Sequence, residues 1–301
     1  MSEFNNETYT ALVTDLINDA FYSKDGSERG KIATIRQYSE VIIRKILNLS
    51  NQEYVTTGKN SILQQLKDIS NNNPLLLNSL EIINNDGNDC THTQKTEKIT
   101  NEDLSRCIDS LFNLYSYLFI SYFTKYEFGK NEKILSSFSI LPPIIRYIAL
   151  EYLYNNNQNN IMIIDKLVLS ILKSYDKEKA ILWLNSKRNT LENMNTVTEQ
   201  VIKDISEKYG DAVAQQIVDN APKNMYISCN ERLNEVDKII TKNGIFSDFE
   251  SAIELYKEKG HVQGEEEEIK EFNSIMEFIY LGRRAIKNNK LNELDKYTVM
   301  V

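Results

Sequence analysis

The chain has 301 residues, 41% hydrophobic and 26% charged, and carries a formal net charge of −8. A surface of that sign repels phosphate backbones, which excludes broad, sequence-independent binding of nucleic acid. Its 10 glycines and 4 prolines are too few for the many tight turns of a sheet protein. We therefore expect an all-α fold of long helices with few connections.

The first residues, MSEFNNETYT, are polar and acidic and lack the basic and apolar regions of a signal peptide. The most apolar windows, 111–123 and 134–153, are bordered or interrupted by basic residues and fall short of the roughly 20 apolar residues that span a bilayer. Three cysteines without a CxxC pair, beside only two histidines, argue against a zinc cluster and favour a reducing compartment. We expect a soluble, cytoplasmic protein with no membrane span, no metal and no cofactor.

Apolar residues at helical spacing predict five helices in the first part of the chain. These helices are expected over residues 3–22, 28–49, 59–69, 74–83 and 101–128. Pro74 suits a first helical turn, and Thr100 with Asp103 resembles a capping box. The polar run NNDGNDCTHTQKTEK, residues 84–98, is expected to be a loop. Gly129 and the polar residues after it mark a boundary, so we predict one helical bundle over 1–129.

The remainder, 130–301, is predicted to form a second helical domain of unknown type. Pro142-Pro143 should end or kink a helix, because each proline lacks the amide donor that an interior position needs. Helices are expected over residues 144–154, 161–173, 177–209, 211–219 and 230–242.

The last part of the chain carries recognisable helix ends. Gly244 is suited to close the helix before it. Ser247 with Glu250 forms a capping box for a helix that ends before Gly260. The final helix is expected over 265–287.

The stretch from Gly87 to His92 is the most informative part of the sequence for function. A polar loop between two apolar helices, holding one of two histidines, is a place where binding or catalytic residues are found. A histidine titrates near neutral pH and can serve as a general acid or base. The alternative is a solvated loop whose histidine has no role.

Arg36, Glu40 and Arg44 are spaced four residues apart, so they lie on one face of the second predicted helix. Such stripes are usually ion pairs worth roughly 0.2 to 0.5 kcal/mol each. Phosphate binding by the two arginines is the alternative interpretation.

Residues 28–126 resemble the HEPN-like superfamily, and more narrowly the small helical domain of unknown function found on restriction-enzyme subunits and other bacterial defence proteins. Arg36 and Glu40, within IRQYSEVIIRKIL, match the arginine and glutamate near the start of a helix in that family. Gly87-Asn88 and His92, within INNDGNDCTH, match its Gly-Asn pair and following histidine. The short amphipathic helix of that family corresponds to residues 62–69 of this chain, and its final long helix corresponds to residues 99–117. The resemblance implies a HEPN-like helical bundle followed by the second helical domain.

The sequence departs from the family at the position that matters most for catalysis. The resemblance implies that active members use the histidine on the 2′-hydroxyl or leaving oxygen, and an arginine a few residues earlier to stabilise the charge on phosphorus. Asn84 stands where this arginine would be. A histidine without a fixed cation cannot stabilise such a charge well, unless Arg36 or Arg44 reaches it from the second helix.

Two hypotheses from different classes remain. The first is a non-catalytic helical interaction protein, an accessory subunit or inhibitor in a bacterial or phage defence or conflict system, with a protein partner. The alternative is a metal-independent ribonuclease toxin that uses His92 and Asn88 with Arg36 or Arg44 and binds RNA at Gly87–His92. A nucleotide-sensing domain is a third hypothesis, and homo-oligomerisation is open. The motifs of nucleotide hydrolysis, dinucleotide binding and triad hydrolysis are missing from the sequence.

Overall fold

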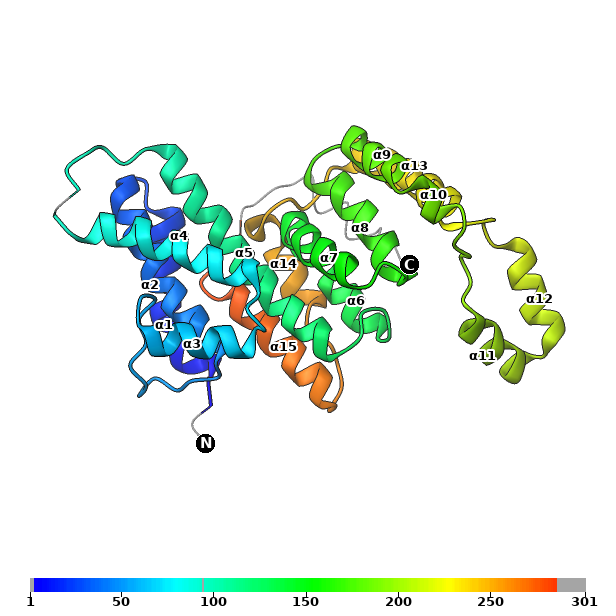
Figure 1. Ribbon diagram of the computed structural model, residues 1–301, viewed down its shortest axis with the longest axis horizontal. Coiled ribbons are helices and arrows are strands. Elements are labelled where there is room, and N and C mark those ends of the chain that lie inside the picture. The colour runs from blue at the N-terminus through cyan, green and yellow to red at the C-terminus, as the bar shows by residue number, and fades with distance from the viewer. Residues whose placement is uncertain (1–2, 94, 286–301) are drawn as a thin grey trace. The chain divides into compact units, whose positions relative to one another are not determined.

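The computed structural model describes residues 3–93 and 95–285, and its regular elements within those ranges are helices without any strand (Figure 1). The all-α fold is therefore confirmed. None of the described helices is both long and apolar enough to cross a bilayer. The described residues divide into two compact units, one numbered 3–149 and 248–285, the other 150–247. The first unit thus continues past the boundary expected at residue 129.

The first unit is built around three helices, α2 (Glu28–Ile46), α4 (Pro74–Thr91) and α5 (Asn101–Lys125), which pack on one another. Its other elements are α1 (Asn6–Ile17), a π-helical turn (Asn18–Tyr22), α3 (Asn60–Ile69), α6 (Glu132–Phe138), α14 (Phe249–Lys259) and α15 (Glu267–Tyr280). Large side chains such as Ile35, Tyr38 and Tyr115 are fully buried where the helices meet. Burial of this kind is the main force that holds such a unit together.

The loop predicted over 84–98 is wrong for its first part, because α4 continues to Thr91. The Asn- and Asp-rich composition suggested a loop, but the spacing of the buried residues stays helical. Leu80, Ile83, Gly87 and Cys90 are all buried at steps of three or four residues. They form one stripe, which faces the packed neighbours of α4.

Helix ends follow the sequence closely at the start of α5. Thr100 and Asp103 form the predicted capping box, with the Thr100 amide 2.9 Å from Asp103 Oδ2. The box predicted for α14 is wrong by one residue, because Asp248 caps the helix and pairs with Ser251. Aspartate is as good an N-cap as serine, so the two neighbouring positions compete for this role.

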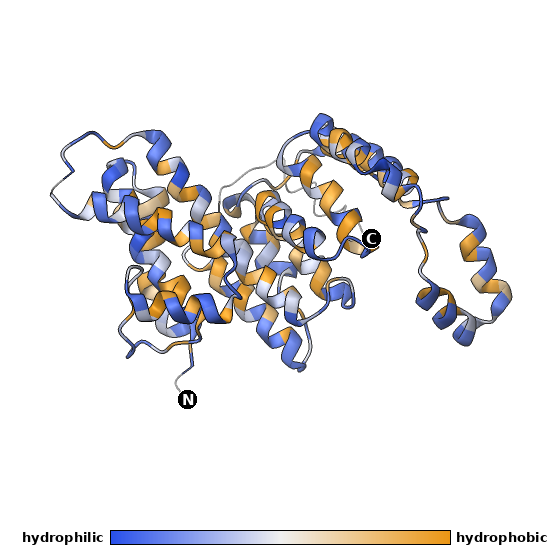
Figure 2. Cartoon of the chain, in the orientation of Figure 1, coloured by the Kyte–Doolittle hydropathy of each residue, from blue (hydrophilic) through white to orange (hydrophobic). Residues whose placement is uncertain are grey.

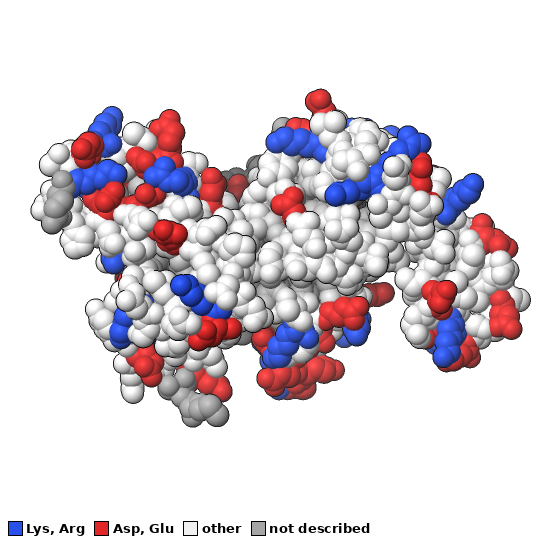
Figure 3. All heavy atoms as spheres, in the orientation of Figure 1, with Lys and Arg blue, Asp and Glu red and all other residues white. Residues whose placement is uncertain are grey.

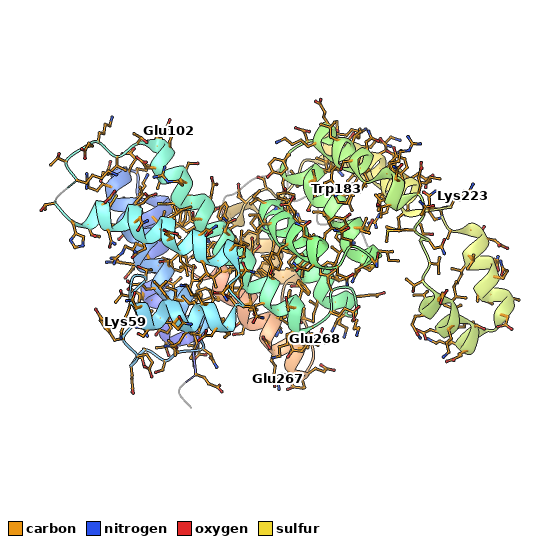
Figure 4. All side chains as sticks on the ribbon, viewed as in Figure 1. Lys59, Glu102, Trp183, Lys223, Glu267 and Glu268 are labelled. Atoms are coloured by element: carbon orange, nitrogen blue, oxygen red, sulfur yellow. The ribbon has the colours of Figure 1, made fainter. Side chains whose placement is uncertain are left out.

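The second unit contains α8 (Ile161–Ser174), α9 (Lys177–Ser186), α10 (Arg188–Leu191), α11 (Glu199–Tyr209), α12 (Asp211–Asn220) and α13 (Met225–Asn243). Helix α7 (Pro143–Asn156) crosses the boundary between the units, and Pro143 occupies its first position, where a missing amide donor costs nothing. Helices α8, α9 and α13 pack together. Trp183, the one tryptophan of the chain, lies on α9 with its ring edge against Tyr154 (Figure 4).

Three further predicted spans differ from the structure. The single helix over 177–209 is wrong: it divides into α9, α10 and α11, because the segment 192–198 (ENMNTVT) leaves the helix and Thr198 starts a new one as its N-cap. The helix predicted over 230–242 begins earlier, at Met225, and ends at Gly244 as expected. The helix predicted over 265–287 ends earlier, at Tyr280. The last two positions of the predicted span lie outside the described residues.

Candidate functional sites

The end of α4 brings two predicted site elements together, because Arg36 of α2 lies directly against Gly87. A methyl group added at Gly87 would lie 2.4 Å from Cδ and 2.6 Å from Cβ of Arg36. Only glycine allows the two helices to approach this closely. The Nε atom of Arg36 is buried and has no hydrogen-bond partner among the described residues.

Asn84 stands at the position where the HEPN-like resemblance predicts an arginine. Its side chain links α4 to the connection that precedes α3. Its Oδ1 atom accepts a hydrogen bond of 2.7 Å from the Thr57 hydroxyl. Burial raises the pKa of Glu40 nearby on α2, and Arg36, the Thr57 amide and Arg44 oppose that rise. A neutral amide and a hydroxyl therefore occupy the place of the expected cation.

Arg44 is not brought to the end of α4. Its Nη1 atom donates to the Ser50 carbonyl at 2.8 Å. Arg29, near the start of α2, instead donates to the Asp89 carbonyl near the end of α4, so the two helices run antiparallel. Arg44 lies 15 residues further along α2, which is about 22 Å of helix. Of the two arginines that the sequence selected, only Arg36 lies against the Gly87–His92 segment.

His92 is the C-cap of α4 and is exposed. Its backbone amide donates to the Asn88 carbonyl at 3.0 Å, and within the described part of the chain its ring forms no hydrogen bond or ion pair. Asn88 is half-buried on the last turn of the helix. No hydrogen bond from a described residue therefore orients the ring.

A second arginine at this end of α4 is Arg29, which was not among the predicted site residues. Nη1 donates to the Asp89 carbonyl at 2.8 Å, and Nη2 donates to the carbonyls of Lys95 at 3.0 Å and Glu97 at 3.1 Å. The guanidinium thus satisfies carbonyls at the end of a helix and in the connection after it. The sequence does carry a signal for Arg29, because this residue precedes Arg36 by two helical turns and so lies on the same face of α2.

Two further cations at this end are paired with carboxylates. Lys95 Nζ lies 2.7 Å from Asp89 Oδ2, and Arg106 Nη2 lies 2.8 Å from Asp86 and 2.9 Å from Asp103. All five side chains keep partial exposure, so each pair contributes little to stability. Their effect on chemistry is larger, because a phosphate group would have to displace these carboxylates.

The charge balance of this region is acidic. Segment 84–106 carries five acidic and three basic residues: Asp86, Asp89, Glu97, Glu102 and Asp103, against Lys95, Lys98 and Arg106. Acidic and basic side chains interleave over this end of the first unit (Figure 3), and Glu102 stands at the start of α5 (Figure 4). Such a surface attracts a polyanion weakly.

The cysteines add no nucleophile here. Cys90 and Cys107 are buried, and burial raises the pKa of both thiols. The Cys107 thiol donates to Asp86 Oδ2 at 3.4 Å. Both thiols are therefore protonated and inert at neutral pH. Among the described residues, no group of three or more His, Cys, Asp or Glu side chains is arranged to hold a metal ion.

A second candidate surface lies in the other unit and consists of α11 and α12, which we call the hairpin. The two helices pack on each other and make only marginal contact with other described helices. Two connections join them to α10 and α13, and Lys223 lies on the returning one (Figures 1 and 4). Gly210 makes the turn between the two helices at φ 89°, a conformation that favours glycine.

The hairpin exposes most of its apolar side chains. Ala214 is its one fully buried residue, whereas Val201 is 43%, Tyr209 60% and Ile217 39% exposed. The apolar positions fall at helical spacing along both helices (Figure 2): Val201, Ile202, Ile205 and Tyr209 on α11, and Val213, Ala214, Ile217 and Val218 on α12. Each helix thus has an apolar face that the hairpin alone does not cover.

The base of the hairpin is closed by two hydrogen bonds. The Met225 amide donates to the Met194 carbonyl at 2.9 Å, and the Thr196 hydroxyl donates to the Pro222 carbonyl at 2.8 Å. The chain therefore leaves and re-enters the second unit at nearly the same point. The hairpin is a self-contained insertion between α10 and α13.

Comparison of the chain with protein-family models, curated proteins and solved structures finds no match. The HEPN-like resemblance rests on the sequence pattern within residues 28–126 and stays a prediction.

Proposed function

We propose that this chain is a non-catalytic helical interaction protein that acts by binding another protein. The observation that carries the proposal is the hairpin, whose apolar side chains remain exposed. Helices of 11 and 10 residues are shorter than the ~12–15 residues at which an isolated helix becomes even marginally stable, so they depend on packing. A protein partner that covers the apolar faces supplies that packing, and exposed apolar patches commonly mark such contacts.

The end of α4 supports the non-catalytic part of the proposal. Phosphoryl chemistry needs a fixed positive charge at the oxygen where negative charge develops. Asn84 offers none, the cations Arg29, Lys95 and Arg106 are held by carbonyls or carboxylates, and the Nε atom of Arg36 is buried where that side chain packs on Gly87. His92 is left as an isolated exposed imidazole.

The setting of the proposed function comes from the sequence resemblance. A HEPN-like domain of the type found on restriction-enzyme subunits suggests an accessory subunit or inhibitor in a bacterial or phage conflict system. The three cysteines are unpaired and buried, which fits the reducing cytoplasm.

The alternative function, a metal-independent ribonuclease, has two observations in its favour. Arg36 lies against Gly87, five residues before His92, and Arg29 donates to the Asp89 carbonyl, three residues before His92. Incubation of the purified protein with total RNA, beside a His92→Ala control, tests it. We expect no cleavage by either protein. His92 is exposed, so the substitution leaves the fold intact, and cleavage that the variant loses would overturn the proposal.

The interaction itself is tested by affinity capture from an extract of the host cells. The full chain is compared with a variant in which residues 197–221 are replaced by a short Gly-Ser linker. Met194 and Met225 are hydrogen-bonded across the cut, so the rest of the unit should keep its fold. We expect a specific protein to be captured by the full chain and lost with the excision. Recovery of RNA alone would contradict the proposal.

A further inference from the structure

The charge of the hairpin indicates which kind of partner its apolar faces accept. The two helices carry five acidic and two basic side chains, a net charge of −3: Glu199, Asp204, Glu207, Asp211 and Asp219, against Lys203 and Lys208. Acidic side chains outnumber basic ones on this part of the surface (Figure 3). A partner of complementary charge is therefore basic at the rim of its contact.

The internal contacts of the hairpin do not neutralise this charge. Gln200 and Gln215 donate to Asp204 and Asp219 at 2.6 and 2.7 Å, but both amides are neutral. The pair Lys203–Glu207 is 3.9 Å apart and fully on the surface. The acidic excess is thus available to a partner.

The shape of the surface selects a helix as the partner. Two packed helices leave a seam along which a third helix can lay its apolar side chains, as in small helical bundles and helix-in-groove complexes. The described part of the hairpin offers no strand edge that an extended peptide could extend. An extended polyanion such as RNA would be repelled by the net negative charge of the hairpin.

A second copy of the hairpin is the less favourable occupant. Each copy would bring the same charge of −3 to the contact, and like charges facing each other oppose association. The charge of the whole chain, −8, acts in the same direction.

We propose that the apolar faces of α11 and α12 bind a basic amphipathic helix of a partner protein. This inference rests on the proposed function and names the partner's chemistry for it. Leucine-like side chains of that helix would cover Val201, Tyr209 and Ile217, and its lysine or arginine side chains would complement the net negative charge of the hairpin.

The probe is a synthetic amphipathic peptide of about five helical turns, with Leu at helical spacing and Lys at every flanking position. A matched peptide carries Glu in place of each Lys. Binding of the labelled peptides to the full chain is measured by fluorescence anisotropy at about 0.15 M salt. We expect the Lys peptide to bind and the Glu peptide to bind at least about tenfold more weakly.

Two substitutions on one helix separate the apolar contact from the charge. Ile217→Asp adds a charge within the apolar face, and Gln216→Asp adds the same charge at the next position, which points away from it. Ile217→Asp should weaken the Lys peptide by about tenfold or more, whereas Gln216→Asp should not weaken it. Excision of residues 197–221 should abolish binding, while the Trp183 fluorescence of the folded unit is kept.

Several outcomes would overturn the inference. Equal affinity for the Lys and Glu peptides, undiminished binding after excision, or equal effects of the two substitutions would each do so. A dimer in light scattering that Ile217→Asp dissolves would assign the surface to a second copy instead. The Lys peptide could fail to bind while the capture experiment still recovers a host protein that depends on the hairpin. That result would refute the proposed chemistry of the partner and leave the proposed function standing.

Discussion

Gly87 shows how one residue sets the distance between two helices. It is the point where α4 meets Arg36 of α2, and a Cβ there would overlap the Cβ of Arg36, which cannot swing away. We predict that Gly87→Ala destabilises the protein by about 1 to 3 kcal/mol through overpacking. Gly30→Ala is the matched control, because that helical glycine has only Ser27 Oγ at 3.4 Å and should gain stability. Urea unfolding of both variants measures this, and equal midpoints would contradict the contact.

Lys45 is a largely buried cation in the first unit. Its Nζ atom donates to Ser274 Oγ at 2.6 Å and to Asn6 Oδ1 at 3.3 Å. Burial lowers the pKa of Lys45 from 10.5 to about 8, and Glu277 and Glu271 oppose that shift. The folded protein therefore releases this proton at a lower pH than the unfolded chain does.

This shift predicts a pH dependence of stability with a definite sign. Between pH values of about 8 and 10.5 the unfolded chain binds more protons at Lys45 than the folded protein, so stability should rise with pH. The slope from this group is at most about 1.4 kcal/mol per pH unit. The free energy of unfolding is measured for the wild type and Lys45→Met across this range. A difference between the two that stays constant with pH would show that the shift is absent.

Two buried arginines of the first unit should respond in opposite ways to the same substitution. Arg283 donates to the Tyr115 hydroxyl at 2.9 Å, and its guanidinium carbon lies 4.2 Å from the centre of the Phe249 ring. Its Nη1 atom is 3.7 Å from Glu250. Arg146 is also buried, which lowers its pKa to about 10, and no carboxylate lies within 4.0 Å of it in the described part of the chain.

We predict that Arg283→Met costs about 3 to 5 kcal/mol, because it leaves Glu250 without its buried partner. Arg146→Met removes a buried charge that has no ion-pair partner and should be neutral or stabilising. Thermal unfolding of the two variants gives the comparison. A strong loss of stability with Arg146→Met would mean that this arginine has a partner that supports the fold.

At the scale of the elements, apolar spacing was a good predictor of helices, and the polar composition of a single segment was a poor one. The buried stripe of Leu80, Ile83, Gly87 and Cys90 continues through a segment rich in Asn and Asp. Helix α4 is therefore longer than the polar residues of that segment suggested. Burial of one face outweighs weak helix propensity on the other. The start of the hairpin was missed for the opposite reason, since a helical pattern was extended through 192–198, although Thr198 is an ordinary signal of a helix start. The break predicted at Gly210 and the helix predicted over 211–219 agree with the turn and with α12.

The candidate site could be predicted only in part. The contact between Arg36 and Gly87 joins two segments that the sequence pattern had already selected. The carbonyls that hold Arg29 could not be foreseen, because they depend on the antiparallel packing of α2 on α4 and on the path of the chain at Lys95 and Glu97. Spacing within one helix is read from sequence, whereas contacts between elements require the fold.

Two N-caps test whether the hairpin is energetically separate from the core. Thr100 caps α5, which is central to the first unit, and Thr198 caps α11. We predict that Thr100→Ala lowers the free energy of unfolding by about 1 kcal/mol. Thr198→Ala should leave the main unfolding transition by circular dichroism unchanged, because α11 packs mainly on α12. An equal shift with both variants would place the hairpin within the cooperative core.

At the scale of the whole molecule, the chain combines a packed helical scaffold with one poorly covered element. The two units each have a core of fully buried side chains, such as Tyr38 in the first and Leu233 in the second. The hairpin carries no comparable core and holds an excess of negative charge. If the contact with a basic helix is made as proposed, raising the salt concentration should weaken it, because the charges at its rim are screened.

Amide hydrogen exchange along the chain tests the central claim most directly. It is measured for the protein alone, with the Lys-bearing peptide, and with a single-stranded RNA. We predict that amides of Glu199–Asn220 exchange faster than those of α5 in the free protein, that the peptide slows them, and that RNA leaves Gly87–His92 unchanged. Protection of the Gly87–His92 segment by RNA, with no change in the hairpin on adding the peptide, would contradict the account.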